Sequence, residues 1–241
     1  MLSATAALLL LLIWIPPTSI QPSAEDSIDT DTIAVSDTMS SHMNTILGCY
    51  SKQLEGCRQL ITVGHCVNTN RVMLKAFKRT GNNWTNVDSL NFAANIGYGG
   101  FAAADCKHEG DGKTPTGIFP ITRYFSKQQD FMARLKKIEI THNTIWVDDP
   151  TDSLYNTYFE QTPKKRRKGE KLLRKDGLYN YAMVIDYNQK REPGKGSAIF
   201  LHCWSKQGKP TLGCVAVEEN NLLKTFEWID SSANPMILIF D

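Results

Sequence analysis

A histidine and a cysteine near the C-terminal end of the chain have the residue types of a nucleophilic catalytic pair. A loop that contains Gly208 and Pro210 separates His202 from Cys214, which directly follows Gly213. A cysteine nucleophile requires a neighbouring base or a lowered pKa, and the base requires a group that orients its second ring nitrogen. Backbone N–H groups at a glycine, where no side chain blocks a substrate carbonyl, suit an oxyanion. The segment predicts thiol chemistry with Cys214 as nucleophile and His202 as base; the alternative is a structural role for both.

The elements that must position this pair are predicted to be mostly β-strands. Residues 197–204 (SAIFLHCW) and 181–187 (YAMVIDY) are apolar on both faces, which is typical of strands inside a sheet. Residues 71–79 alternate apolar and polar side chains, and together with 59–67 they predict a hairpin. Two helices and a closing strand are also predicted, at 126–138, 218–229 and 235–240.

The six cysteines predict disulfides if the protein is secreted. If Cys214 stays free for chemistry, an odd five remain, so a second cysteine should also be unpaired. Strand alternation selects Cys203, which shares an apolar face with Leu201 and is predicted to be a small buried side chain. A Cys203–Cys214 disulfide without thiol chemistry is the alternative. Two bridges, in one of three connectivities, are then predicted among Cys49, Cys57, Cys66 and Cys106.

Residues 1–20 have the pattern of a signal peptide. The run AALLLLLIWI at 6–15 has the length of a signal-peptide core and only about half that of a membrane span. Residues 21–44 are rich in Ser, Thr and Asp and predict a flexible acidic spacer. We therefore expect a secreted protein, extracellular or periplasmic, with one folded domain at 45–241 and no stable membrane span. An uncleaved membrane anchor is the alternative.

Three further segments precede the histidine–cysteine block, in a fixed order. They are 110–120 (GDGKTPTGIFP), 147–150 (VDDP) leading to Tyr155-Asn156, and 181–187. With 196–230 (GSAIFLHCWSKQGKPTLGCVAVEENNLLKTFEWID), they resemble the catalytic domain of the L,D-transpeptidases (YkuD type), in which a histidine on a strand precedes a [Ser/Thr]-x-Gly-Cys turn. The resemblance covers about residues 59–241, and its specificity comes from the order of the four blocks.

The resemblance implies a fold and a set of roles. It implies a mainly β fold with a few helices, a β-rich α+β arrangement of two curved sheets packed as a sandwich. Cys214 would be the thiolate nucleophile and His202 the base. Cys203 would contribute only its backbone carbonyl, and the backbone N–H groups of Gly213 and Cys214 would be the oxyanion donors. The side chains expected at the substrate are those of Thr211, Leu212 and Trp204.

The implied substrate is a peptidoglycan stem peptide. The sulfur would attack the carbonyl of the third stem residue, D-Ala would leave, and an amine or water would resolve the thioester. Ala216 stands where many members carry Arg or Asn, and the loop between His202 and Cys214 is shorter than in the commoner members. Alternatives to a transpeptidase are a hydrolase of the same bonds (L,D-carboxypeptidase or endopeptidase) and an inactive wall-binding member.

Charge and composition limit the partners. With 41% hydrophobic and 22% charged residues, the chain is neither wholly disordered nor a bundle of membrane spans. Residues 1–44 contain no Lys or Arg and five acids, so the remainder is basic and favours an anionic partner. The basic run at 164–175 predicts a solvated loop that meets anionic wall polymers rather than nucleic acid. No cofactor is implied, and no paired His and Cys spacing predicts a metal site.

Overall fold

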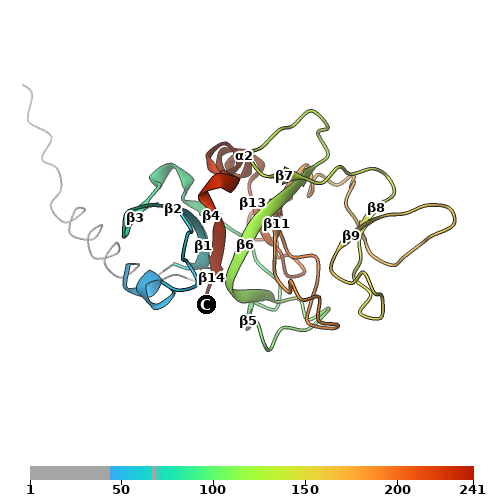
Figure 1. Ribbon diagram of the computed structural model, residues 1–241, viewed down its shortest axis with the longest axis horizontal. Helices are drawn as coiled ribbons and strands as arrows, with labels where there is room; N and C mark the ends of the chain where they lie inside the picture. The colour runs from blue at the N-terminus through green and yellow to red at the C-terminus, as the bar shows by residue number, and fades with distance from the viewer. Residues whose placement is uncertain (1–43, 67–68, 70) are drawn as a thin grey trace, which may run out of the picture. The chain divides into compact units, whose positions relative to one another are not determined.

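A computed structural model describes residues 44–66, 69 and 71–241 of the chain (Figure 1). The predicted signal peptide at 1–20 and, apart from Asn44, the predicted spacer at 21–44 lie outside the described residues. Residues 44–49 are helical and precede the first strand. Within the described ranges, no helix is both long enough and apolar enough to cross a membrane.

Most of the strands belong to one 11-stranded sheet. Three short strands pair beside its main path: β4 (Phe92–Ala93), β5 (Phe101–Ala103) and β7 (Lys136–Lys137). The main path runs in spatial order through β13 (Val215–Val217), β12 (Phe200–Cys203), β11 (Tyr181–Ile185), β6 (Thr114–Ser126), β14 (Met236–Ile239), β1 (Gln59–His65), β2 (Val72–Thr80) and β3 (Asn83–Asn86). The predicted hairpin is confirmed, because β1 and β2 pair antiparallel.

The long strand β6 joins the two halves of this sheet, as Figure 1 shows. Its residues 117–120 pair with β14, whereas 121–126 pair with β11 across a register shift between Val184 and Ile185. An irregularity of this kind bends the strand and increases its twist. The two curved sheets expected from the sequence therefore meet in one shared strand, and the predicted mainly β class is confirmed.

A smaller sheet and three short helical segments complete the domain. The sheet has the strand order β10 (Glu170–Lys171), β8 (Thr144–Trp146) and β9 (Tyr158–Glu160). Helix α2 (Glu219–Trp228) confirms the helix predicted at 218–229, and Leu222 and Phe226 pack into the main core with Leu201 of β12. Two 3-10 turns, η1 (Asp88–Leu90) and η2 (Ser231–Ala233), are the remaining regular elements outside the helical residues 44–49.

The prediction of a helix at 126–138 is wrong. β6 continues to Ser126, whose hydroxyl accepts a hydrogen bond from the Gln128 N–H at 2.9 Å and turns the chain. Phe131 then packs edge-on against Tyr181 and Phe226, with ring centroids 4.7 and 5.1 Å apart. Burial of an aromatic ring contributes more free energy than the intrinsic helix preference of the surrounding exposed residues, so packing determines this segment.

The predicted disulfides are also absent, because all six cysteines are free thiols. Cys57 is buried in the cluster around Leu60, and its thiol donates to the Gln59 carbonyl oxygen at 3.2 Å. Cys203 lies in the main core on β12, and the alternative Cys203–Cys214 bridge is excluded with the others. The prediction that Cys203 is buried and unpaired is confirmed, whereas Cys57 was wrongly assigned to a bridge, because in its apolar cluster it behaves as a small hydrophobic side chain and needs no partner cysteine.

Two leucines near His202 and Cys214 test how strongly β12 depends on its core. Leu201 is fully buried, whereas Leu212 is 84% exposed. We predict that Leu201→Ala lowers the free energy of unfolding by about 2–5 kcal/mol, because it leaves a cavity between β12 and α2. The matched variant Leu212→Ala should change it by no more than about 0.5 kcal/mol. Urea denaturation followed by tryptophan fluorescence measures both, and equal effects would contradict this account of the core.

Candidate active site

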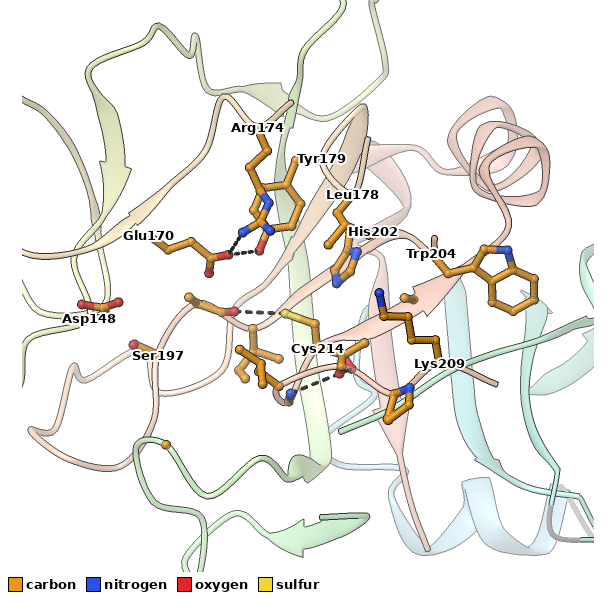
Figure 2. A pocket seen from close by; sticks show the side chains of 18 of the residues that line it. Asp148, Glu170, Arg174, Leu178, Tyr179, Ser197, His202, Trp204, Lys209 and Cys214 are labelled. Carbon is orange, nitrogen blue, oxygen red and sulfur yellow. Dashed lines mark hydrogen bonds and ion pairs between the residues drawn. The ribbon is translucent and has the colours of Figure 1, made fainter. Parts of the chain in front are cut away.

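A cavity of about 440 Å³ lies between β12, the loop after it and residues 170–179 (Figure 2). It is lined by His202 and Cys214, and also by the other side chains expected at the substrate, Thr211, Leu212 and Trp204. The Cys203 side chain points away from it into the main core, so that only its backbone takes part in the site. The structure thus brings together residues that the sequence places on a strand and on a separate turn.

His202 is held in one tautomer by its own strand. Its Nδ1 lies 2.8 Å from the Cys203 carbonyl oxygen, and the side chain is only 5% exposed. Because a carbonyl oxygen can only accept, Nδ1 carries the proton, and Nε2 is unprotonated in the neutral ring. Tyr179 packs edge-on against the imidazole, with ring centroids 5.3 Å apart. These two contacts fix the orientation of the ring, and His202 and Cys214 line the same cavity.

Cys214 sits immediately before β13, beside β12. The two strands pair in parallel with His202 opposite Ala216, so the cysteine lies next to Phe200, which shares a face of β12 with His202. The Phe200 N–H points at Sγ at 3.4 Å, and the thiol donates to the Ala198 carbonyl oxygen at 3.2 Å, the contact drawn as a dashed line in Figure 2. The thiol proton must leave this oxygen before His202 can accept it.

Both members of the pair are neutral at rest. Burial, reinforced by the negative charge of Glu170, raises the pKa of the Cys214 thiol to about 12. Burial lowers the pKa of His202 to about 4, and the Cys203 carbonyl opposes this shift only in part. The thiolate that the resemblance implies at Cys214 is disfavoured at rest, because the apolar cluster of Phe200, Trp146 and neighbouring side chains surrounds the sulfur.

The turn before Cys214 is held by its own hydrogen bonds. Gly213 has φ +142°, and an added Cβ would lie 2.9 Å from the Lys113 carbonyl oxygen, so glycine is required. Its N–H donates to Thr211 Oγ1 at 3.1 Å, and the Thr211 hydroxyl donates to the Cys214 carbonyl oxygen at 2.6 Å. The Gly213 N–H expected at an oxyanion is therefore already bonded, and Thr211 holds the turn. The Cys214 N–H has no acceptor among the described residues and is the donor left for an oxyanion.

Asn95, which no sequence pattern identified, fixes the loop between His202 and Cys214. This buried side chain donates to the Lys206 carbonyl oxygen at 2.9 Å and accepts from the Gly208 N–H at 2.8 Å. Its backbone also exchanges two hydrogen bonds with Ala216 in β13. One residue therefore ties both the start of the loop and the strand after the cysteine to the same point.

A second position, Asn156, holds the acceptor of the thiol proton. Its Oδ1 accepts from the Ala198 N–H at 3.2 Å and from Trp146 Nε1 at 2.8 Å. Ala198 has φ +53°, a conformation that costs a non-glycine residue free energy and needs such support. Asn156 belongs to one of the four blocks that the sequence singled out, and its contacts give that block a physical role.

One side of the cavity is charged, which the sequence did not predict. Glu170 accepts from the Tyr179 hydroxyl at 2.7 Å and from Arg174 Nη1 at 3.0 Å, and burial raises its pKa. Arg174 also lies over the Tyr179 ring, 5.2 Å from its centroid. Glu170 and Arg174 come from the basic run, which is thus only partly a solvated loop, because Leu172 is fully buried. The single acid of the run, Glu170, and its apolar pair Leu172-Leu173 are the sequence features that could have indicated a buried part. The exposed basic residues of the run are Lys164, Lys165, Arg166, Lys168, Lys171 and Lys175.

Comparison with known families agrees with this geometry. The model of the L,D-transpeptidase catalytic domain (YkuD) matches residues 65–238. The chain belongs to this family. The matched range of the L,D-transpeptidase domain contains β12, the Asn95-anchored loop, His202 and Cys214. Searches of curated proteins and of solved structures return no match.

The neutral pair predicts how Cys214 responds to pH. Below a pKa of about 12, the thiolate fraction of Cys214 rises about tenfold for each unit by which the pH increases. The rate of alkylation of Cys214 by iodoacetamide should therefore rise steadily from about pH 6 to about pH 10. Site-resolved mass spectrometry measures this rate, and the urea-unfolded chain is the control, since its thiols level off above about pH 8.5. A rate that is already constant near neutral pH would indicate a thiolate–imidazolium pair and contradict the account.

The role of Asn95 predicts a loop that opens without it. Asn95→Ala removes both side-chain hydrogen bonds to the loop, so trypsin should cut after Lys206 about tenfold faster or more. Asn220→Ala removes an exposed amide on α2 that bonds only Glu218, and it should leave the cleavage rate unchanged. Equal cleavage of the Asn95 variant and the wild-type chain would show that the loop does not depend on this residue.

Proposed function

We propose that this L,D-transpeptidase-family protein is a secreted cysteine acyltransferase that acts on peptidoglycan stem peptides through a thioester. The observation that carries the proposal is the His202 ring, fixed with Nδ1 protonated, in the cavity that also contains the Cys214 thiol. An arrangement of base, orienting carbonyl and nucleophile within one cavity is what acyl transfer requires.

The first half of the reaction transfers the acyl group to sulfur. His202 Nε2 accepts the thiol proton as the Cys214 sulfur attacks the carbonyl carbon of the third stem residue. The backbone N–H of Cys214 donates to the developing oxyanion. When the intermediate collapses, the protonated imidazole gives its proton to the leaving amine of D-Ala, the C–N bond breaks and a thioester remains.

The second half regenerates the thiol. An amine from a second stem, or water, attacks the thioester while His202 accepts its proton, and the returning sulfur then recovers that proton. An amine gives transpeptidation and water gives carboxypeptidation. Ala216, which is 1% exposed at the cavity, offers no polar contact to an acceptor, and this specific feature favours the hydrolase as the second candidate.

Secretion is part of the proposal and depends on sequence alone. The apolar run at 6–15 supports export, and peptidoglycan stems lie outside the cytoplasmic membrane. The exposed basic residues of the 164–175 run support contact with anionic wall polymers through screened electrostatic attraction. Mass analysis of the N-terminus of protein recovered from the medium or periplasm would test removal of the leader.

The proposal predicts which side chains acylation requires. The wild-type chain, incubated with a tetrapeptide stem, should gain the mass of the acyl tripeptide with release of D-Ala. Cys214→Ala should gain none, and His202→Gln should react about 100-fold to 10,000-fold more slowly because its base is missing. Cys49→Ala, which changes an exposed cysteine outside the cavity, should react as the wild type does.

Product analysis separates the candidates. With an acceptor amine present, a cross-linked product identifies a transferase, and free tripeptide in both tubes identifies a hydrolase. Unchanged stem peptide in both tubes, with no mass added to the protein, would reject both enzymatic candidates and leave the wall-binding alternative.

A further inference from the structure

Three cationic side chains line the cavity besides His202, and two of them are already neutralised. Lys107 Nζ lies 2.7 Å from Asp111 Oδ1 and donates to the His108 carbonyl oxygen at 2.8 Å. Arg174 pairs with Glu170 at 3.0 Å and with Asp176. Lys209 has no carboxylate partner in the described part of the chain. It is the cavity cation that is free to bind an anion.

The backbone of Lys209 is held in place although its side chain is exposed. Its N–H donates to the Lys206 carbonyl oxygen at 3.3 Å, and Asn95 bonds that same oxygen and the neighbouring Gly208 N–H. Pro210 follows and restricts the chain further. In Figure 2 the Lys209 side chain extends from this loop into the cavity in the direction of the His202 ring. The fixed backbone therefore presents the ammonium group at one side of the site.

The reaction determines which substrate group arrives at that side. In the proposed function, on which this inference depends, His202 gives its proton to the nitrogen of the leaving amino acid. The leaving residue must therefore lie beside the imidazole. In a stem that ends one residue after the cleaved bond, only a Cα separates that nitrogen from the terminal carboxylate. A cation that extends toward His202 is thus placed to meet this carboxylate.

The remaining charges of the cavity favour the same orientation of the stem peptide, with its carboxylate near Lys209. Asp148 and Glu170 lie on the other side of Cys214 from Lys209 in Figure 2, and Glu109 also lines the cavity. Carboxylates there repel an anionic group and disfavour the reversed orientation of the peptide. We propose that Lys209 is the specificity residue that binds the free α-carboxylate of the C-terminal D-amino acid of the stem peptide.

Binding without chemistry tests this directly. The full chain carrying Cys214→Ala is titrated calorimetrically with a tetrapeptide stem that ends in a carboxylate, and with the same peptide ending in a carboxamide. The carboxylate should bind about tenfold more tightly, as a charge-assisted hydrogen bond predicts. Adding Lys209→Ala should abolish this preference, and Lys209→Arg should restore most of it. Lys206→Ala, on the same loop but outside the cavity lining, should keep it.

The outcomes separate this inference from the proposed function. If Lys209→Ala keeps the preference, or if the Cys214→Ala chain binds neither peptide, the carboxylate site is overturned. If the preference disappears with Lys209 while the wild-type chain forms no thioester, the site stands and the acyltransferase proposal fails. If the wild-type chain forms the thioester with a preference for the carboxylate peptide, and Lys209→Ala in the Cys214-containing chain removes that preference through a raised KM with little change in kcat, both are supported.

Discussion

The hydrogen bond between His202 Nδ1 and the Cys203 carbonyl oxygen determines which nitrogen of the imidazole faces the cavity. Because the acceptor is a backbone atom of β12, the strand that carries the histidine also orients it, and the Cys203 side chain is free to serve the core. Tyr179 packs against the imidazole, while its hydroxyl donates to Glu170 and the Arg174 guanidinium lies over its ring. The charged wall of the cavity is thus linked to the base by direct contacts.

The burial that fixes the His202 ring also disfavours the charged forms of His202 and Cys214. Cys214 and His202 are surrounded by the aromatic rings of Phe200 and Tyr179, so that the thiol and the imidazole are each more stable without charge. A neutral thiol bonded to Ala198 is a weak nucleophile, which protects it before substrate arrives. In the proposed reaction, proton transfer to Nε2 accompanies attack on the carbonyl, and the oriented tautomer makes this possible without a preformed ion pair.

The elements with a continuous apolar pattern could be predicted from the sequence. The prediction failed where contacts between distant segments determine the local structure. The strands around 181–185 and 200–203 and the helix α2 follow from local patterns, and so does the approach of Cys214 to β12. Asn95 and Arg174 have no local signature, because their roles arise only when loops far apart in the chain meet. The segment after Ser126 has helical spacing, but the aromatic contacts of Phe131 override it. Cysteine parity and strand alternation correctly selected Cys203 as buried and unpaired, but parity predicted bridges among four other cysteines, all of which are free thiols.

The tautomer of His202 can be observed by ¹⁵N NMR of the chain labelled at its five histidines, with the His202→Gln variant providing the assignment. At neutral pH the account predicts one protonated nitrogen, Nδ1, and one unprotonated nitrogen, Nε2, with protonation of the ring only near pH 4. Two protonated nitrogens at neutral pH, or a proton on Nε2 alone, would contradict it.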